Sequence, residues 1–391
     1  MESFLERNSF FSHLYRFFDA ATPSWLAYLL AASVIVFVLV NGLMLFTMAL
    51  IYMERRLIGR FQVRLGPNRV GPFGLLQPVA DAIKILFKED LVPVGADRIT
   101  FNLAPVLFIF PVFLSLAVVP FGERYFLADL NVAVLFIMGV SGLSTIAILM
   151  AGWSSANRYA MFGAVRAVAQ LISYEVPMVL SLVGVLLLVG SMSMVTIVEG
   201  QRLPLILLQP LGFLVFFMAA LAELNRTPFD LVEAESELVA GYHTEYSGMK
   251  FGMFMLAEFA ASVVSSAIIV TVFFKGWEGP LLPSHLWFVI KLFVVLFVLI
   301  WIRATLPRLR IDQIMAFAWK VLFPLSLVNI AATAVEVLLW PQPTTAQIWA
   351  MVGINWGVTF VSLALWSWLM GPTLRPNMPQ LLRGATTGKA A

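Results

Sequence analysis

The sequence contains no cysteine and only three histidines in 391 residues. Without cysteine the chain can hold neither a disulfide nor a thiolate-bound zinc or iron–sulfur centre, and three scattered histidines do not suit paired axial ligation of haem. It also lacks a strand followed by the glycine-rich fingerprint of a dinucleotide site. We therefore expect no metal, flavin or covalently bound cofactor in this chain, and any electrons that it uses must be carried by another subunit.

Charged residues are also scarce, at 12% of the sequence against 61% hydrophobic residues. Long uninterrupted apolar runs at this composition are typical of a polytopic membrane protein rather than of a soluble domain with a large core. The net charge of +3 follows from basic loops on the cytoplasmic side of such a protein, so nucleic acid is not expected as a partner. The predicted fold class is therefore all-α and polytopic.

Nine apolar runs are long enough to be transmembrane helices. They lie at residues 26–53, 101–121, 131–151, 164–190, 205–222, 253–274, 286–305, 314–340 and 346–370. The first would be about 42 Å long as a helix, against about 30 Å for the hydrocarbon core of a bilayer, so it must tilt or project from the membrane. We expect one membrane domain, 1–391, in which an N-terminal segment (1–25) precedes a core of eight spans (26–340) and a ninth span with its tail (341–391).

The basic residues outside these spans predict the orientation. Of these, 18 fall in the first, third, fifth and seventh connections and the C-terminal tail, and five fall on the other side. Because loops rich in Lys and Arg remain in the cytoplasm, the N-terminus is expected outside and the C-terminus inside. No small-residue cleavage site follows at signal-peptide distance, so the first helix is expected to be retained.

An acidic stretch at 223–246 lies between two spans, on the predicted cytoplasmic side. Against one Arg226 and one His243, it contains the acidic residues Glu223, Asp230, Glu233, Glu235, Glu237 and Glu245. Like charges in a partly desolvated site titrate together and some of their pKa values rise toward neutrality, which a proton relay requires. The alternative is a solvated acidic loop that docks onto a basic partner, and the two roles are compatible. His243 also lies in this stretch, and an unperturbed histidine titrates near neutral pH, but no catalytic role is expected for it.

Ionisable residues inside the spans are a second group of candidates. A charge at mid-membrane costs about 2.5–3.5 kcal/mol on insertion scales, so Glu175 and Glu258 are expected to be functional unless a neighbouring helix supplies an ion-pair partner. Arg166, Gln170 and Tyr174 share one helical stripe. Glu175 lies about 180° from Arg166 on an ideal helix and is expected to face elsewhere unless Pro177 distorts the helix.

Three further ionisable residues lie in the seventh and eighth predicted spans. Lys291 and Glu336 are near the span ends, where they are expected to snorkel to the interface. Lys320 lies deeper, so snorkelling explains its position less easily.

The longest connection, residues 54–100, contains a predicted amphipathic helix on the cytoplasmic side. Gly66-Pro67, Gly71-Pro72 and Gly74 indicate turns before it. Apolar residues then recur at helical spacing, at Leu75, Leu76, Val79, Ala82, Ile83, Leu86 and Phe87. Such a helix either lies on the membrane surface or forms the lip at which an apolar ligand enters from lipid, and periodicity does not distinguish the two.

Four segments carry a resemblance to a known family. They are ERRLIGRFQVRLGPNRVGPFGLLQPVADAIK from Glu54, AVAQLISYEVP from Ala167, ELNRTPFDLVEAESELVAGYHTEYSGMKF from Glu223 and RATLPRLRIDQIMAFAWK from Arg303. From about Leu26 to Trp340 the chain resembles the family of the membrane-embedded H subunit of bacterial NADH–quinone oxidoreductase, respiratory complex I, to which the mitochondrially encoded subunit 1 belongs. The ninth span resembles an extension seen in bacterial members.

The resemblance implies a multi-pass heel subunit of the bacterial inner membrane. Its partners would be the quinone-site and iron–sulfur subunits of a peripheral arm, the small subunits and antiporter-like subunits of a membrane arm, and lipid. The substrate would be a quinone, either ubiquinone or menaquinone, that enters a chamber formed partly by this chain. It would be reduced near an iron–sulfur cluster held elsewhere, and its reduction would be coupled to proton or sodium pumping.

The same resemblance assigns roles to residues, but no catalytic residue and no metal ligand. It places at the quinone chamber Glu54, Arg55, Asp81, Arg226, Asp230 and Arg303. It places on the proton path Tyr174, Glu175, Glu223, Glu233, Glu235 and Glu258. Each chamber residue is alternatively a juxtamembrane charge that obeys the topology rule, and for Arg56 and Arg60 this is the preferred interpretation.

Two other functions stay open. A homologous subunit of a ferredoxin-linked quinone reductase or of a membrane-bound hydrogenase shares this membrane design and differs in its soluble partners. A stand-alone secondary transporter is less favoured, because no clear two-fold repeat of motifs is visible.

Overall fold

The chain forms a bundle of helices. The computed structural model describes residues 9–20, 22–230 and 240–370. Within these residues eight helical runs are long and apolar enough to cross a membrane, and no strand is present beyond a single bridge between Gly122 and Tyr125. The runs are α3 (Ser24–Phe61), α5 (Arg98–Val118), α6 (Ala133–Ser154), α7 (Arg158–Val189), α12 (Gly248–Phe273), α13 (Ser284–Thr305), a run from α14 (Ile311–Phe317) through the π-helical η3 (Ala318–Leu322) to α15 (Phe323–Leu339), and α16 (Thr345–Met370). The all-α membrane class is confirmed, whereas the count of nine spans stays a prediction.

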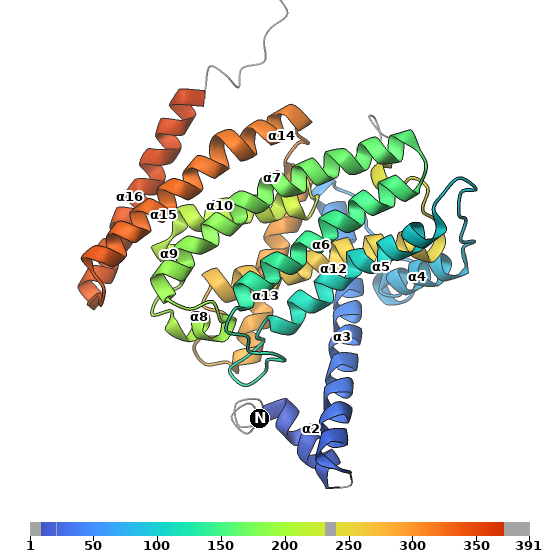
Figure 1. Ribbon diagram of the computed structural model, residues 1–391, viewed down its shortest axis with the longest axis horizontal. Helices are drawn as coiled ribbons and strands as arrows, with labels where there is room; N and C mark the ends of the chain where they lie inside the picture. Colours follow the sequence, from blue (N-terminus) through green and yellow to red (C-terminus); the bar gives the residue numbers. More distant parts are fainter. Residues whose placement is uncertain (1–8, 21, 231–239, 371–391) are drawn as a thin grey trace, which may run out of the picture.

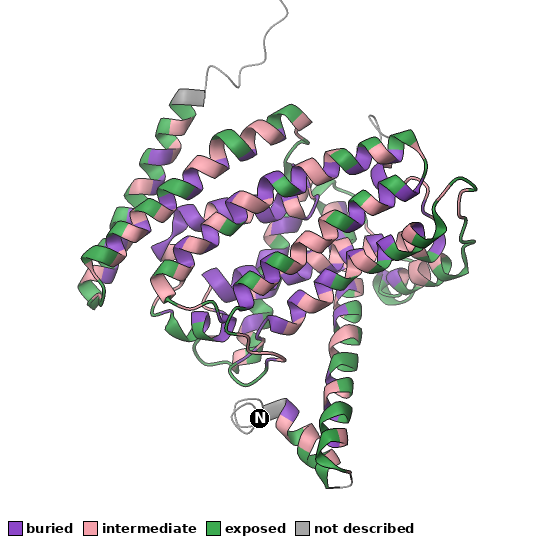
Figure 2. Ribbon diagram, in the orientation of Figure 1, coloured by how far each residue is buried: buried purple, intermediate pink, exposed green. Residues whose placement is uncertain are grey.

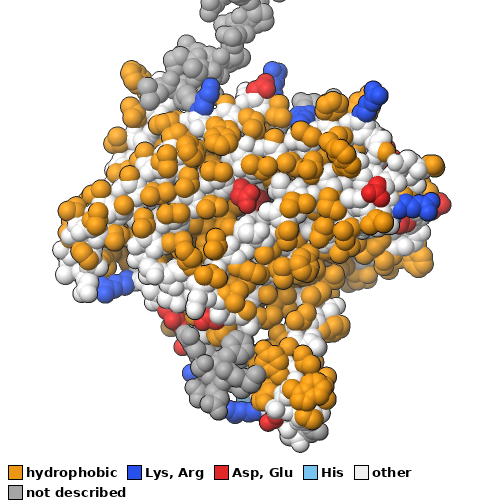
Figure 3. Space-filling model, in the orientation of Figure 1, with side chains coloured by type: hydrophobic (Ala, Val, Ile, Leu, Met, Phe, Trp, Pro, Cys, Tyr) orange, Lys and Arg blue, Asp and Glu red, His pale blue; other side chains and the backbone are white. Residues whose placement is uncertain are grey.

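Shorter helices connect or flank these runs. They are α2 (Ser9–Asp19), η1 (Pro72–Gly74), α4 (Gln77–Phe87), α8 (Met194–Gly200), α9 (Leu205–Leu208), α10 (Pro210–Glu223) and η2 (Gly241–His243). Buried residues concentrate on the central helices of the bundle, while α3 leaves it and carries α2 beside its N-terminal end (Figure 1, Figure 2). Hydrophobic side chains cover most of the face shown in Figure 3, and Lys and Arg lie along its edges, as expected for a chain surrounded by lipid.

The first span is longer than predicted. Helix α3 does not end near Met53 but continues to Phe61, so its 38 residues reach about 57 Å. The continuation consists mostly of Glu, Arg, Leu and Ile, which are tolerated well in a helix, and the turn-forming Gly66 follows only later. Glu54 and Arg55, predicted at the end of the helix, therefore lie two turns inside it.

The fifth predicted span is broken. Residues 205–222 belong to α9 and α10, which are separated at Gln209, where the backbone (φ −133°, ψ 64°) is not helical. Pro210 explains the break, because proline has no N–H to donate to the preceding turn and disfavours helical geometry at the residue before it. The 14 residues of α10 span only about 21 Å, which is less than the thickness of the hydrocarbon core.

The eighth predicted span contains a π-helical turn. Pro324 has no N–H to donate to Lys320 four residues earlier, and the helix widens at η3 just before it. The carbonyl of Lys320 accepts instead from the indole N–H of Trp366 in α16, at 2.5 Å. The Lys320 side chain, predicted to lie deep in the span, is exposed on the surface of the bundle.

Lys291 in α13, predicted to snorkel, is held by protein carbonyls instead. Its ammonium group donates to the carbonyls that follow α12, those of Phe274 at 2.8 Å, Gly276 at 2.9 Å and Glu278 at 2.6 Å. Carbonyls at the end of a helix have no partner within the helix, and the helix dipole favours a cation there. Lys291 therefore caps α12 and joins it to α13.

Glu336 in α15, also predicted to snorkel, is buried. It is 3% exposed, and one of its carboxylate oxygens accepts from the Asn355 amide of α16 at 2.8 Å. The end of α15 at Leu339 is close in sequence, but α16 covers the side chain.

Replacing Lys291 with methionine is expected to destabilise the protein by about 2–3 kcal/mol. The substitution keeps the apolar stem but removes three charge-assisted hydrogen bonds and leaves the carbonyls unsatisfied. Thermal unfolding of the purified membrane protein would show the effect as a lower transition temperature. Lys320→Met is the matched control, because that side chain is exposed. Equal transition temperatures for the two variants would contradict the capping role.

Candidate functional site

Glu54 is buried between two arginines from distant parts of the chain. Arg226 Nη1 donates to both of its carboxylate oxygens, at 2.9 and 3.1 Å, and Arg303 Nη1 donates to Oε1. Only 8% of the Glu54 side chain is exposed. Arg226 also lies over the ring of Phe259, with Cζ 4.4 Å from its centroid. Glu54, Arg226 and Arg303, all predicted at the chamber, form what we call the Glu54 cluster.

The space beside the Glu54 cluster is small. A cavity of about 20 Å³ touches all three residues, which is room for a water molecule but not for an aromatic ring. A larger apolar cavity of about 530 Å³ lies between α3 and α13, nearer their N-terminal ends, and is lined in part by Leu39, Phe46 and Leu292. Its volume is typical of ligand pockets. An aromatic ring can contact the Glu54 cluster only if another chain adds to this space or if the surrounding side chains move.

Arg55 and Asp81 form a second, separate pair. Arg55 Nη1 donates to Asp81 Oδ2, and Gln77 Nε2 donates to Asp81 Oδ1 at 3.0 Å. The two charged side chains are 48% and 33% exposed, so the pair contributes only about 0–1 kcal/mol. It does connect α3 to α4, the helix that forms at the position of the predicted amphipathic one. Val79 and Ile83 of α4 are exposed.

Asp230 is bound by an arginine that sequence reasoning missed. Arg308 Nη2 lies 3.0 Å from Asp230 Oδ2, and only 2% of the Asp230 side chain is exposed. The backbone N–H of Leu309 also donates to the Pro228 carbonyl at 3.0 Å. The segment after α10 is thus fastened to the segment between α13 and α14. Arg308 lies in one of the motifs that carry the family resemblance. Its distance from Asp230 along the sequence does not indicate that the two residues are in contact.

Gln170 and Tyr174 in α7 hold segments that carry site residues. Gln170 Nε2 donates to the carbonyls of Ala222 and Phe229, at 2.8 and 2.9 Å. Tyr174 is fully buried, and its hydroxyl donates to the Ile314 carbonyl at 2.9 Å. Tyr174 therefore fixes α14 and does not line the carboxylate cavity described next. Its place on a proton path stays a prediction.

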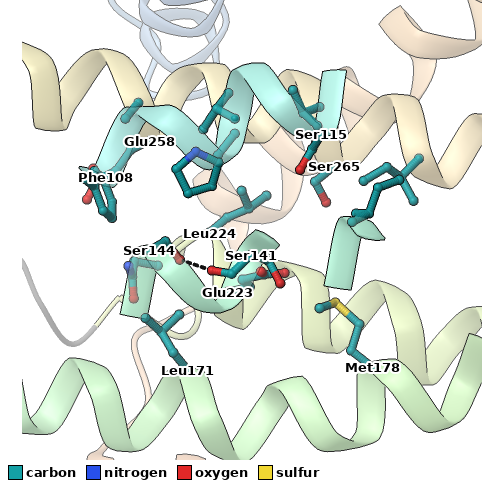
Figure 4. A pocket seen from close by; sticks show the side chains of 18 of the residues that line it. Phe108, Ser115, Ser141, Ser144, Leu171, Met178, Glu223, Leu224, Glu258 and Ser265 are labelled. Carbon is teal, nitrogen blue, oxygen red and sulfur yellow. Dashed lines mark hydrogen bonds between the residues drawn. The ribbon is translucent and has the colours of Figure 1, made fainter. Parts of the chain in front are cut away.

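Glu223 and Glu258 line one cavity at the centre of the bundle. It has a volume of about 100 Å³ and lies among α5, α6, α7, α10 and α12. Figure 4 shows Glu223 beside Ser141 and Ser144 of α6, and Glu258 near Phe108 of α5. The volume is sufficient for several water molecules, and the hydroxyl and carboxyl groups offer them partners. Two carboxyl groups that share such a cavity can exchange protons through water.

Two further contacts reach this carboxylate cavity. Glu175 lies beside Gly142 of α6, and its carboxylate interacts electrostatically with that of Glu223. The hydroxyl of Tyr242, in η2 at the end of the acidic stretch, donates to Glu258 Oε1 at 3.1 Å. Sequence reasoning missed Tyr242, because one tyrosine in a loop gives neither a periodic nor a charge signal. Three predicted proton-path glutamates thus lie in or beside one cavity.

The other two predicted proton-path glutamates, Glu233 and Glu235, lie outside the described residues, as does Glu237. The residues on either side of them are well anchored. Asp230 binds Arg308 before them, and Tyr242 binds Glu258 after them. The described residues on both sides of 231–239 therefore contact the site.

His243 does not titrate near neutral pH, unlike an unperturbed histidine. Burial lowers its pKa to about 4. The side chain is 5% exposed and packs against the rings of Tyr242 and Phe251. Apolar surroundings disfavour the charged imidazolium form, so His243 is neutral at pH 7.

Lowering the pH from 6.5 toward 4 is expected to destabilise the folded chain through His243 by about 3 kcal/mol. In this window the unfolded state binds a proton at this histidine, whereas the folded state does so only near its pKa of about 4. Stability is therefore complete above the unfolded pKa and falls as the pH is lowered. Thermal unfolding at pH 7 and pH 5 should show a smaller difference for His243→Phe than for the unsubstituted chain. Identical differences would contradict the assignment.

Comparison with known proteins identifies relatives over most of the chain. A family profile described as NADH dehydrogenase matches residues 33–334, which include the Glu54 cluster and the carboxylate cavity. The chain is 57% identical over 317 residues, 81% of this chain and 89% of the relative, to the NADH-quinone oxidoreductase H subunit of Dehalococcoides mccartyi strain CBDB1. The proteins of the same name from Brevibacillus brevis and Geobacillus kaustophilus are 50% and 49% identical over 323 and 341 residues, covering 81% and 86% of this chain and 95% and 98% of the relatives.

Proposed function

The chain belongs to the NADH dehydrogenase family, and we propose that it is the membrane subunit of an NADH–quinone oxidoreductase that forms part of the quinone chamber and couples quinone reduction to ion pumping. Its partners are the peripheral-arm subunits that carry electrons and the other subunits of the membrane arm. Quinone, as ubiquinone or menaquinone, is the substrate. This chain contributes walls, charges and proton-carrying groups.

The observation that carries the proposal is the position of the short segment Glu223–Asp230. Glu223 lines the carboxylate cavity, Arg226 binds Glu54, and Asp230 binds Arg308. A change of charge at the Glu54 cluster therefore acts close to a carboxyl group in the cavity. Two unit charges about 10 Å apart interact by about 1.7 kcal/mol at an effective dielectric constant of about 20, which changes a protonation equilibrium more than tenfold.

Quinone reduction supplies such a change of charge. A neutral quinone becomes quinol by taking up two electrons and two protons, and its headgroup is anionic whenever an electron arrives before a proton. An anionic headgroup attracts the guanidinium groups of Arg226 and Arg303 and competes with Glu54 for them. The potential at Glu223 then becomes more negative, which favours its protonation. The proton that Glu223 takes up then reaches it through water in the carboxylate cavity.

The proposal includes a membrane arrangement. We place nine crossings, counting α9 and α10 together as the fifth, with the N-terminus outside the bacterial inner membrane and the acidic stretch in the cytoplasm. The distribution of basic residues among the connections supports this orientation. We place α4 at the cytoplasmic membrane surface, where its exposed Val79, Ile83 and Leu86 contact lipid. The apolar cavity along α3 and α13 offers space for the tail of a quinone that arrives from the bilayer.

A photoreactive quinone analogue tests the chamber in the assembled complex. On irradiation it is expected to label peptides of α3, α4 or the last turn of α13, which contain Glu54, Asp81 and Arg303. An excess of unlabelled quinone should prevent the labelling. Label found only on other subunits would contradict the chamber assignment. The soluble subunits that co-purify with the chain distinguish NADH from ferredoxin or hydrogen as the electron source.

A further inference from the structure

A second group of buried polar side chains lies away from the carboxylate cavity. It consists of Gln209, Asn329, Thr333, Glu336 and Asn355, which are 0%, 2%, 0%, 3% and 4% exposed. Gln209 precedes α10 and Glu223 ends it, so the two sites are about 21 Å apart along this helix. None of the five residues lines the carboxylate cavity. We call them the Glu336 group.

The helix break and two glycines make room for this group. At the break, Gln209 Nε2 donates to Thr333 Oγ1 at 3.0 Å. A Cβ atom added to Gly184 of α7 would lie 2.6 Å from Asn329 Nδ2, and one added to Gly212 of α10 would lie 3.0 Å from it. The amide of Asn329 thus occupies space that only glycine leaves open on α7. The five side chains therefore lie together where α7, α10, α15 and α16 meet.

Three atoms of the Glu336 group have no hydrogen-bond partner among the described residues: Gln209 Oε1, Asn329 Nδ2 and Glu336 Oε1. A buried polar atom without a hydrogen-bond partner costs several kcal/mol in a membrane interior, because lipid chains cannot act as that partner. The three atoms are one donor (Asn329 Nδ2) and two acceptors (Gln209 Oε1 and Glu336 Oε1). A water molecule can bind either type, because it both donates and accepts hydrogen bonds. Water bound at these atoms would satisfy them.

Glu336 forms no ion pair with a described residue, and its hydrogen-bond donor is the Asn355 amide at 2.8 Å. α9 and α16 contain no titratable residue. The titratable residues of the other elements packed against α15 lie toward the opposite end of the bundle: Arg158, Tyr159, Arg166, Tyr174 and Glu175 on α7, Glu223 on α10, Asp312 on α14 and Lys320 on η3. An ionised carboxylate with one amide donor and no cation is costly in hydrocarbon. The neutral carboxylic acid, whose O–H donates to water, satisfies the site better.

A pocket lies close to the Glu336 group. It has a volume of about 270 Å³ and is lined in part by Arg202, Leu208 and Met351. Leu208 directly precedes Gln209, and Met351 lies one helical turn before Asn355 on α16. Arg202, whose guanidinium donates to the Pro343 carbonyl at 3.1 Å, is the charged residue of this pocket. The pocket thus comes within about one helical turn of the buried group.

We propose that the Glu336 group is a hydrated proton-binding site in which Glu336 carries a proton that exchanges with water from the pocket beside Arg202. Its ligands are water and a proton. Glu336 and the whole of α16 lie beyond residues 33–334, the segment that matches the family. The site therefore combines Glu336 and Asn355, which lie beyond the segment that the family profile matches, with three residues inside it. It does not depend on the quinone chamber.

Infrared spectroscopy of the assembled complex tests this site, because a protonated carboxyl group has a C=O stretching band that ionised carboxylates lack. Glu336→Gln is expected to remove one such band at pH 7. The matched control is Glu278→Gln, whose carboxylate pairs with Lys275 at 2.5 Å outside the membrane spans, and it should remove none. Transfer to D₂O should shift the band to lower wavenumber as the proton exchanges. A spectrum that loses no band in Glu336→Gln, or a band that D₂O does not shift, overturns the proposal.

A second variant keeps the test decisive if Glu336→Gln fails to assemble. Asn355→Leu keeps the carboxyl group and removes the amide that donates to it. The band is then expected to move to higher wavenumber, because a carbonyl without a hydrogen bond has a stiffer C=O stretch. A band at the same position as in the unsubstituted complex would overturn the proposal. Quinone reduction is no part of this measurement, so its outcome is separate from that of the proposed function.

Discussion

Glu54→Ala is expected to lower quinone-dependent turnover of the assembled complex at least about tenfold. Removing one partner of a buried ion pair costs about 3–5 kcal/mol, because the remaining charges are left uncompensated, and about 1.4 kcal/mol of this in the activation barrier gives a tenfold loss. Without Glu54, Arg226 and Arg303 repel each other, and the segment that carries Glu223 moves. NADH oxidation with an artificial acceptor in the soluble arm should not change, because those electrons do not pass the quinone.

Asp312→Ala is the matched control for this variant. It also removes one carboxylate, but from an exposed position in the first turn of α14. Its turnover should stay within about twofold of the unsubstituted complex, since exposed substitutions usually change stability by less than about 0.5 kcal/mol. If Glu54→Ala behaved like Asp312→Ala with quinone, the Glu54 cluster would have no part in the reaction.

Glu223→Gln is expected to reduce proton pumping driven by quinone reduction about tenfold or more. Glutamine keeps the shape of the side chain and the hydration of the cavity, but it does not carry a proton, and proton transfer by a positioned side chain contributes about 10²–10⁴-fold. Proton translocation measured in proteoliposomes with NADH and quinone reports the effect. NADH oxidation with an artificial acceptor should again be intact. Glu235→Gln is predicted to behave in the same way, although Glu235 lies outside the described residues.

Ser265→Ala supplies the control within the same cavity. Ser265 also lines it but has no titratable group, so pumping should fall by less than about threefold. An equal loss of pumping and of artificial-acceptor activity in Glu223→Gln would indicate a damaged complex rather than an interrupted proton path. Equal effects of Glu223→Gln and Ser265→Ala would remove Glu223 from the path.

The sequence predicts the helical spans well, because apolar runs of sufficient length have few alternatives in a membrane. It predicts their ends less well. The extension of α3 from Glu54 to Phe61 contains four charged residues among helix formers such as Leu57, and hydropathy counts it as loop. Pro210 is visible in the sequence, but hydropathy does not report that an apolar run is broken at Gln209.

The Glu54 cluster is predicted only through resemblance. Glu54 is separated by 172 residues from Arg226 and by 249 from Arg303, and no spacing rule relates positions so distant. Arg308 and Tyr242 were missed for the same reason, since only the folded chain shows that they meet Asp230 and Glu258.

Glu336 illustrates the opposite error. Its position near the end of a span predicts snorkelling, but α16 covers it. Which helix packs over which residue is a tertiary property that hydropathy does not contain.

A double-variant cycle with Glu54→Gln and Glu223→Gln tests most directly whether the Glu54 cluster acts on the carboxylate cavity. The rate of quinone reduction is measured for the unsubstituted complex, for each single variant and for the double variant under identical conditions. Coupling through the segment Glu223–Asp230 predicts that the two effects differ from additivity by at least about 1 kcal/mol, or roughly fivefold. Effects that add to within about 0.5 kcal/mol would mean that the cluster and the cavity act independently, which contradicts the proposed coupling.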